Sequence, residues 1–190
     1  MKQSLGAKTI AAPLPAWVIG TYSPEGRPNA MTASWTGICN SIPPSVYFSV
    51  RETRYTWDCI QANPAFSVNI PGRGQAAVTD YLGIESGRSV DKLAKAGLTA
   101  VECGSVQAPY LAEFPLVLEC SVVKTLELGS HIMVVGEIKD VLCDADLLDD
   151  KGKLDVEKLK PFSYCPGDGR YHGPGDVLGA GYALGKDIGK

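Results

Sequence analysis

Two arginines and two threonines stand together where an apolar strand leads into a predicted helix. Arg51, Thr53, Arg54 and Thr56 directly follow the strand Val46 to Val50. The first amides of a helix have no partner inside it, and the helix dipole is positive there. With two cationic side chains and two hydroxyl groups beside it, such a start could bind a phosphate or another anion. On spacing alone, an ordinary capped helix with solvated arginines is the simpler explanation.

The segment Asn29 to Trp35, which precedes this strand in the chain, carries short, partly hydroxylic side chains that a flat ligand could approach closely. Because side chains alternate across a strand, its two faces differ in character. One face would present Ala30, Thr32 and Ser34, and the other Met31, Ala33 and Trp35. A planar ring could receive hydrogen bonds from this backbone while its phosphate reaches the adjacent helix start. A barrel strand whose small residues fit the inward taper accounts for the same pattern.

His131 is the more informative of the two histidines. It follows Gly129-Ser130 at the start of a predicted strand, where a histidine can contact a ligand or donate a proton. It can equally cap a turn, whereas His172 lies in a glycine-rich tail and is expected at the surface. The sequence contains no nucleophile elbow, no P-loop and no GxGxxG after a strand. A bound cofactor could therefore carry the chemistry.

The composition describes one globular domain. The chain has 190 residues, 45% of them hydrophobic, and a formal net charge of -3. The acidic balance argues against a general nucleic-acid binder. No apolar run approaches the ~20 residues of a membrane span, and the first residues lack the apolar core of a signal peptide.

Cysteine spacing predicts no metal site. The six cysteines contain no C-x-x-C pair, and zinc and iron–sulfur spacings are missing. Most lie in apolar runs, where buried thiols are typical, and this usage suits a reducing cytoplasm. The cysteines are Cys39, Cys59, Cys103, Cys120, Cys143 and Cys165.

The first half of the chain predicts a β-hairpin followed by a further strand. Apolar and β-branched residues indicate a strand over Trp17 to Tyr22, and Ser23-Pro24-Glu25-Gly26 is typical of a tight turn. A second strand is expected from Asn29 to about Thr36. Gly37 to Ser45 contains two prolines and is expected to be a loop. Val46 to Val50 is apolar on both faces, which favours a central strand.

Short helices are predicted between the strands. Thr53 and Ser89 are the expected N-caps, and Gly83 and Gly97 the expected ends. The helices cover Thr53 to about Ala62, Gln75 to Leu82 and Val90 to Ala96.

The second half contains the two longest strand candidates, Leu116 to Leu126 and His131 to Val141, which are expected to pair antiparallel. Phe66 to Ile70 is a further strand, and Asp155 to Lys160 a helical turn. Hairpins dominate and no βαβ rhythm repeats. The fold class is therefore predicted as mainly β, an antiparallel β-barrel with peripheral α-helices, in a single domain over residues 1–190.

The chain as a whole resembles the flavin reductase-like, FMN-binding split-barrel family, and within it the flavoredoxins. The resemblance rests on the order and spacing of several segments, since no single one is decisive, and it closes with the Gly/Tyr-rich tail. The segments are SLGAKTIAAPLPAWVIGTYSPEGRPNAMTASWTGICNSIPPSVYFSV, TRYTWDCIQANPAFSVNIP, DYLGIESGRSVDKLAKAGLT, APYLAEFPLVLEC and GSHIMVVGEIKDV.

The resemblance implies a homodimer of split barrels with one FMN per subunit near the interface. Ser86, Gly87 and Lys92 belong to a stretch resembling the family's S-G-x-x-x-D-K, which lies near the flavin. Related reductases often have G-D-H where this chain has Gly129-Ser130-His131, which implies His131 near the flavin or a nicotinamide. The ring and ribityl chain would be lined by Asn29, Ala30, Met31, Thr32, Ala33, Ser34 and Trp35, and the phosphate surrounded by Arg51, Thr53, Arg54 and Thr56.

The function expected from this resemblance is that of a cytoplasmic FMN-dependent oxidoreductase. It would be a flavin reductase using NADH or NADPH, or a flavoredoxin-like electron carrier, with a redox protein or a flavin-dependent monooxygenase as partner. The tail over residues 163–190 is expected to pack on the barrel or on the dimer partner. Two alternatives stay open: a non-catalytic ligand-binding or protein-binding barrel with a decayed flavin site, and a redox protein based on a reactive Cys39.

Overall fold

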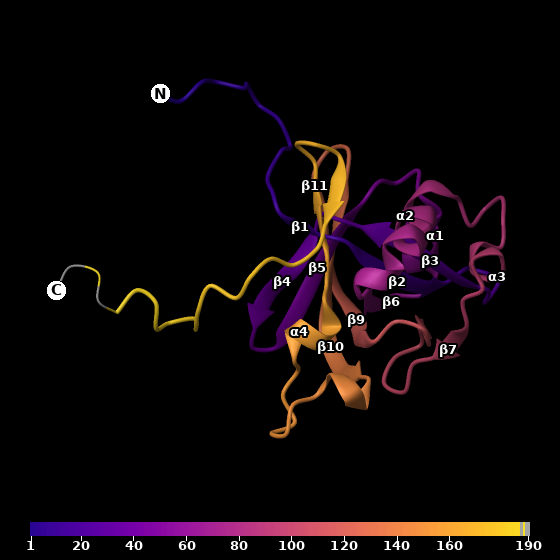
Figure 1. Ribbon diagram of the computed structural model, residues 1–190. Coiled ribbons are helices and arrows are strands. Elements are labelled where there is room, and N and C mark those ends of the chain that lie inside the picture. The colour runs from indigo at the N-terminus through magenta and orange to yellow at the C-terminus, as the bar shows by residue number, and fades with distance from the viewer. Residues whose placement is uncertain (187, 189–190) are drawn as a thin grey trace.

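A seven-stranded antiparallel sheet forms the body of the protein. The computed structural model describes residues 1–186 and 188. The sheet order is β3-β2-β6-β9-β10-β5-β4, and it curls until β3 contacts β5 (Figure 1). The strands are β2 (Trp17–Tyr22), β3 (Pro28–Ala33), β4 (Thr36–Ser41), β5 (Pro44–Val50), β6 (Ala65–Ile70), β9 (Leu116–Glu127) and β10 (Ile132–Cys143).

Smaller elements decorate this barrel. Two short β units lie outside the main sheet: β1 (Leu14–Pro15) pairs with the hairpin of β11 (Ser163–Cys165) and β12 (Arg170–His172), and β7 (Ala100–Glu102) pairs with β8 (Pro109–Leu111). Helices α1, α2 and α3 gather on one side of the barrel (Figure 1). The helices are α1 (Tyr55–Ala62), η1 (Arg73–Gln75), α2 (Ala76–Ile84), α3 (Lys92–Ala96), η2 (Ala145–Leu147) and α4 (Val156–Leu159).

The core forms because alternate side chains of the strands point inward. In β5, Val46, Phe48 and Val50 are buried, and Tyr47 and Ser49 between them are half-buried. Phe48 packs edge-on against Phe66 of β6 with ring centroids 5.0 Å apart. Burying such side chains is worth about 1.5–3 kcal/mol each. A second apolar cluster lies under the helices, where Val18 and Ala30 meet Leu82 of α2.

The strongest hairpin predictions are confirmed. The structure has β2 over Trp17–Tyr22, as predicted, and it pairs antiparallel with β3 through a turn in which the Gly26 amide donates to the Ser23 carbonyl. Strands β9 and β10 pair antiparallel along their length, and the helical turn after Asp155 is present as α4.

The prediction of a loop over Gly37 to Ser45 is wrong. Residues Thr36–Ser41 form strand β4, which pairs with β5 at the edge of the sheet. An edge strand buries little, and its residues after Gly37 are exposed, so the hydrophobic alternation that reveals buried strands is missing. The two prolines occupy the turn and the first position of β5, both of which tolerate proline.

Three predicted helix boundaries are corrected. Helix α1 begins at Tyr55 with Arg54 as N-cap, so Thr53 does not cap it. Helix α2 continues through Gly83 to Ile84, because the glycine packs against Thr32 of β3, where a Cβ would lie 3.3 Å from the threonine Cβ. Helix α3 is capped by Asp91, whose side chain accepts from the Ala94 amide, rather than by Ser89.

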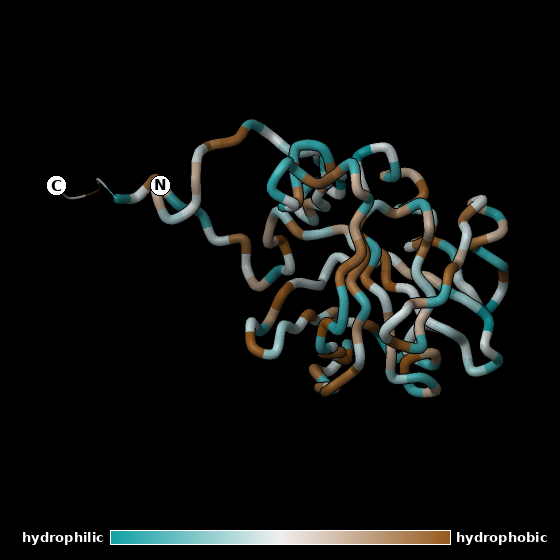
Figure 2. Tube along the Cα trace, turned by 90° about the horizontal axis from the view of Figure 1, so that it is seen from below, coloured by the Kyte–Doolittle hydropathy of each residue, from teal (hydrophilic) through white to brown (hydrophobic). Residues whose placement is uncertain are grey.

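Both ends of the chain extend from the side of the barrel opposite α3 (Figures 1 and 2). The first thirteen residues are exposed, and so are residues 173–186 and 188. The tail from residue 163 begins as the β11–β12 hairpin, where Tyr171 donates a hydrogen bond to Asp80 of α2 at 2.9 Å. Packing of the exposed part of the tail on a partner subunit stays a prediction.

Candidate functional site

The start of α1 offers backbone amides to an incoming group. Its N-cap residue, Arg54, has extended backbone angles and no side-chain hydrogen bond caps the helix. The Trp57 amide donates to the Arg54 carbonyl at 2.9 Å, whereas the amides of Tyr55 and Thr56 precede the first intrahelical acceptor. The partial positive charge of the dipole adds to that of the arginine. The arrangement predicted from the sequence thus exists, displaced to Tyr55.

A first cavity of about 210 Å³ opens beside this helix start. It lies between the beginning of β3, the start of α1 and the segment that follows α2. It brings together eight residues predicted to contact a cofactor: Asn29, Met31, Thr53, Arg54, Thr56, Ser86, Gly87 and Lys92.

Asn29 ties the cavity wall together. It is 5% exposed, and its side-chain amide donates to the Thr56 hydroxyl at 3.2 Å and to that of Thr21 at 3.4 Å. The loop after α2 comes so close that a Cβ on Gly87 would lie 2.2 Å from the Asn29 Oδ1. Glycine at this position is therefore a requirement of packing.

Lys92 places a buried ammonium group at the back of the same cavity. It is 5% exposed and donates to the carbonyls of Leu82 at 3.0 Å and Glu85 at 3.1 Å. An ammonium has three N–H groups, so one remains for another acceptor. Burial and then the Arg54 charge lower the pKa of Lys92 to about 8. A bound anion would relieve this cost.

The cationic side chains here differ in whether they have carboxylate partners. Arg88 pairs with Asp58 of α1 at 2.5 Å and lies over the Tyr55 ring. Among residues 1–186 and 188, no carboxylate lies within ion-pair distance of Arg51 or Arg54. Glu85 lines the first cavity and partly offsets its positive charge.

A second cavity of about 310 Å³ adjoins the first and shares Met31 and Arg54 with it. It runs along the end of β3 towards β5 and the start of β10. Its lining includes further predicted residues and two that were not predicted, Ser49 and Val50. The lining residues are Met31, Thr32, Ala33, Ser34, Trp35, Ser49, Val50, Arg51, Arg54 and His131.

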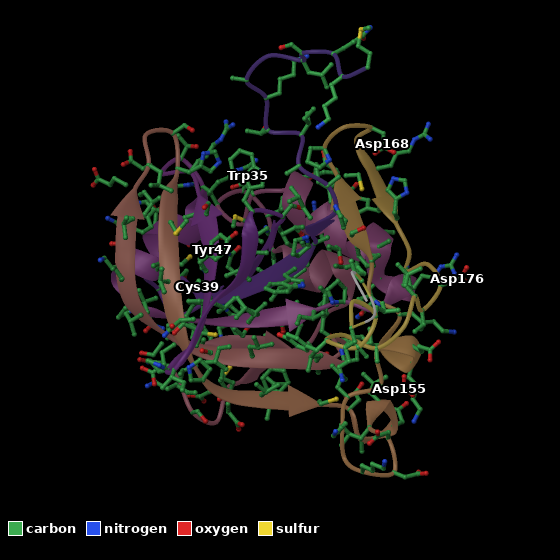
Figure 3. The ribbon with its side chains drawn as sticks, turned by 90° about the vertical axis from the view of Figure 1, so that its left-hand side faces the viewer. Trp35, Cys39, Tyr47, Asp155, Asp168 and Asp176 are labelled. Atoms are coloured by element: carbon green, nitrogen blue, oxygen red, sulfur yellow. The ribbon has the colours of Figure 1, made fainter. Side chains whose placement is uncertain are left out.

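An aromatic pair marks the open end of this second cavity. The rings of Trp35 and His131 lie 4.5 Å apart and are tilted by 41°. Trp35 is 38% exposed, and Figure 3 shows it on the same face as Tyr47 and Cys39. Burial and then the Arg51 charge lower the pKa of His131, which favours its neutral imidazole. Its Nδ1 lies 2.9 Å from the Ser130 hydroxyl.

Two of the predicted residues lie differently from expectation. Ala30 is fully buried in the cluster under the helices and lines neither cavity, so its side chain cannot meet a ligand there. The Thr32 hydroxyl is already engaged, since it donates to the Thr79 carbonyl of α2. Cys39 is exposed on β4 and lines neither cavity.

Sequence reasoning missed Tyr55, Gly83 and Glu85 as site residues, and all three also line the first cavity. Tyr55 is the first residue of α1, and its hydroxyl lies 3.2 Å from a Glu25 carboxylate oxygen in the β2–β3 turn. The displaced helix start explains the first omission. Glu85 directly precedes the predicted Ser86-Gly87 stretch, and that adjacency was the available signal.

Comparisons with known proteins agree on one family. A family model described as a flavin reductase like domain matches residues 10–167. A flavoredoxin of Desulfovibrio vulgaris (Miyazaki F) is 41% identical, with a TM-score of 0.93 over 98% of this chain and 100% of that one. A flavoredoxin from Methanosarcina acetivorans is 32% identical, with a TM-score of 0.90 over 98% of each chain. These superpositions confirm the predicted mainly β split barrel with peripheral helices.

Curated relatives add a reductase. A protein of Pseudomonas syringae named FMN reductase (NADH) RutF is 29% identical over 65% of this chain and 67% of its own length. The chain aligns with less than two thirds of two other relatives, 65% of a protein of Archaeoglobus fulgidus and 59% of one of Aeropyrum pernix. Within the described part of the chain, none of the helices is long and apolar enough to cross a membrane.

Proposed function

Because the chain belongs to the flavin reductase-like domain family, we propose that it is an FMN-dependent oxidoreductase whose cofactor occupies the two joined cavities. One observation carries the proposal: Arg51 and Arg54 stand without carboxylate partners, within residues 1–186 and 188, beside a helix start that no side chain caps. Both features suit an anionic ligand.

The lining of the cavities fits a molecule with a phosphate at one end and a ring at the other. The phosphate would lie in the first cavity, near Thr53, Arg54 and Thr56, with the Lys92 N–H at its back. Gly87 lets the loop after α2 close over it. The ring would lie along Met31 to Trp35 in the second cavity, which opens at Trp35 and His131.

Bound FMN supplies redox chemistry that the side chains of this site lack. The protein contributes position and electrostatics: Arg54 lines both cavities, and the His131 imidazole can donate or accept a hydrogen bond at the open end. The half-exposed Trp35 leaves that end accessible to a second molecule. The ring end is therefore where an electron donor or acceptor would approach.

The donor is NADH, NADPH or a redox protein, and a flavin-dependent monooxygenase is a suitable acceptor of the reduced flavin. The name of the Pseudomonas syringae relative supports NADH, and the flavoredoxin neighbours support a carrier. We also propose a homodimer in the cytoplasm. The six cysteines, all free, fit a reducing compartment.

Anaerobic titration of the purified protein tests the proposal. The protein should carry or bind FMN, and NADH or NADPH should bleach its visible flavin absorbance if it is a reductase. Bleaching by a reduced partner protein alone would identify a carrier. Binding without reduction by any donor would indicate a barrel with a decayed site, and a protein that ignores added FMN would overturn the proposal.

A further inference from the structure

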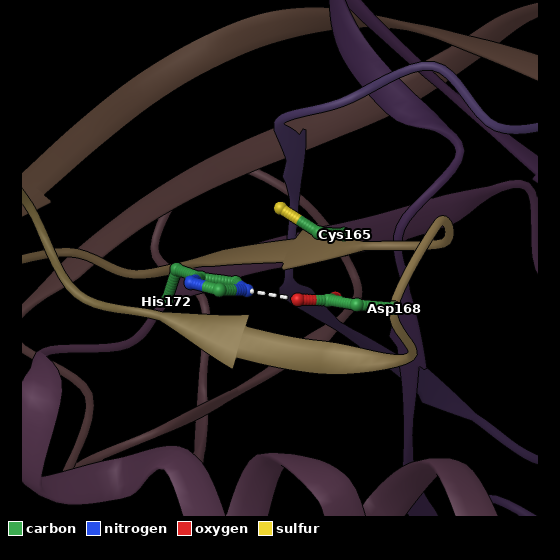
Figure 4. A group of neighbouring side chains, drawn as sticks. All are labelled: Cys165, Asp168 and His172. Atoms are coloured by element: carbon green, nitrogen blue, oxygen red, sulfur yellow. Dashed lines mark hydrogen bonds and ion pairs between the residues drawn. The ribbon is translucent and has the colours of Figure 1, made fainter.

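Three side chains with metal-binding atoms meet in the β11–β12 hairpin, away from both cavities. Cys165, Asp168 and His172 each offer one ligand atom, and these atoms all lie within 4.8 Å of one another (Figure 4). The spacing is C-x-x-D-x-x-x-H. The sequence prediction of no metal site rested on the absence of C-x-x-C pairs, and this spacing does not contain such a pair.

The hairpin register puts these side chains on one face. Cys165 pairs with Arg170 and Ser163 with His172, so Cys165 and His172 are diagonal neighbours on the same side of the ladder. The turn closes through the Gly169 amide, which donates to the Cys165 carbonyl at 2.8 Å. The sulfur and imidazole are therefore positioned by backbone pairing.

The turn also aims the carboxylate. The Arg170 amide donates to one oxygen of Asp168 at 3.0 Å, and the other oxygen lies 2.9 Å from the His172 Nε2. Desolvation is the largest single effect on the pKa of Asp168 and raises it. The hydrogen bonds from His172 and the Arg170 amide together outweigh it, so the pKa of Asp168 is lowered. An ion pair explains the Asp168–His172 contact, but it does not explain the cysteine placed beside both groups.

We propose that Cys165, Asp168 and His172 form a binding site for Zn²⁺, with water as the fourth ligand. Thiolate, imidazole and carboxylate together are typical of zinc, whereas calcium and magnesium take oxygen ligands. Zinc bonds of about 2.0–2.3 Å require ligand atoms about 3.3–3.8 Å apart. The ligand atoms lie within 4.8 Å of one another, and the His172 Nε2 and Asp168 carboxylate, now 2.9 Å apart, would have to separate slightly. Because the side chains of His172 and Asp168 are 48% and 43% exposed, rotation can supply both adjustments. Binding releases the thiol proton of Cys165.

The ion would fasten a segment that connects distant parts of the chain. Strand β11 pairs with β1 near the N-terminus, and Tyr171 of β12 is bonded to Asp80 of α2. Zinc would tie Asp168 of the turn to His172 at the open end of the hairpin, from which the exposed residues 173–186 continue. None of the three ligands lines either cavity, so the site is independent of the proposed cofactor.

Metal titration of the full-length protein tests the site. After treatment with a chelator, the wild-type protein is titrated with Zn²⁺ in competition with a chromophoric chelator, and Co²⁺ is used for spectroscopy. We expect one Zn²⁺ per chain and a Co²⁺ spectrum with a thiolate charge-transfer band. Removing a ligand in Cys165→Ser, Asp168→Asn or His172→Gln should weaken Zn²⁺ binding by at least about tenfold. Tenfold is the lower end of the loss seen when only a residue that supports a metal ligand is changed.

Matched controls keep the test specific. Cys39→Ser removes another accessible thiol, and Asp176→Asn removes a carboxylate just beyond the hairpin (Figure 3). Both should bind Zn²⁺ like the wild type. A wild-type protein that binds no Zn²⁺, or binding that survives Cys165→Ser unchanged, would overturn the proposal without reference to any variant's folding. FMN content is measured in parallel and should not change, which separates this outcome from that of the proposed function.

Discussion

The two cavities of the candidate site differ in how firmly their walls are held. In the first, Asn29 and Lys92 are almost completely buried and hydrogen-bonded, and Gly87 leaves no space for a side chain. In the second, Trp35 and His131 are partly exposed and contact each other through their rings. For the proposed cofactor, we infer a division of roles between the cavities. The enclosed first cavity would provide most of the affinity, and the open second cavity would give reaction partners access to the ring.

Gly87→Ala should have the largest effect on this division. A Cβ at this position would lie 2.2 Å from the Asn29 Oδ1, so the loop or the asparagine must move. We expect FMN binding to weaken by up to about 3 kcal/mol, the upper cost of such overpacking, measured by titration of the FMN-free protein. Gly104→Ala is the control, because nothing lies within 4 Å of a Cβ there. Equal affinities for the two variants would contradict the enclosed first cavity.

Arg54→Ala should weaken FMN binding by about 1–3 kcal/mol, as expected for loss of a hydrogen bond to a charged group. Arg54 occupies the N-cap position of α1 and borders both cavities. Arg73→Ala, which removes an exposed arginine outside them, should bind FMN like the wild type. Unchanged affinity in Arg54→Ala would place the phosphate elsewhere.

Lys92 should make FMN affinity depend on pH. Its pKa is lowered to about 8 in the folded protein from an ordinary 10.5, so between these values the unfolded chain binds the proton more tightly and folding gains stability as pH rises. A phosphate beside the ammonium favours its charged form. Affinity in the wild type should therefore fall as pH rises above about 8, and fall less in Lys92→Met. Parallel pH profiles would exclude contact between Lys92 and the phosphate.

His131→Asn should have the smallest effect on affinity. The residue is partly exposed at the open end, so FMN binding should change by less than about 0.5 kcal/mol. Reduction by a nicotinamide should nevertheless slow, since the variant loses the imidazole beside Trp35. Stopped-flow absorbance measures the rate of flavin reduction separately from the FMN affinity. A large loss of affinity with unchanged reduction would reverse the proposed division.

Local sequence patterns predicted the strands and turns that are determined by residues close to one another in the chain. The bounds of β2 followed from its apolar and β-branched residues, and the β9–β10 pairing followed from two long strand candidates joined by a short link. Strand β4 was missed because an exposed edge strand carries no hydrophobic alternation. The N-cap of α1 was predicted one residue early, because Thr53 has the right side chain for an N-cap but Arg54 occupies the position.

The site was predictable in its residues more than in its geometry. The suitability of the helix start for an anion follows from elementary electrostatics, and the structure brings Thr53, Arg54 and Thr56 to one cavity. The approach of Gly87 to Asn29 depends on where the loop after α2 packs, which no local pattern encodes. Ala30 shows the same limit, since α2 covers its side of the strand.

Because Arg54 borders both cavities, it should affect how strongly the protein prefers FMN over riboflavin. Because one guanidinium borders the space for the phosphate and the space for the ring, its placement by one group affects the other. Riboflavin, which has the ring without the phosphate, would then lose more than the phosphate contacts themselves. The contributions of the two halves would then be non-additive, and Arg54 would be the side chain that couples them.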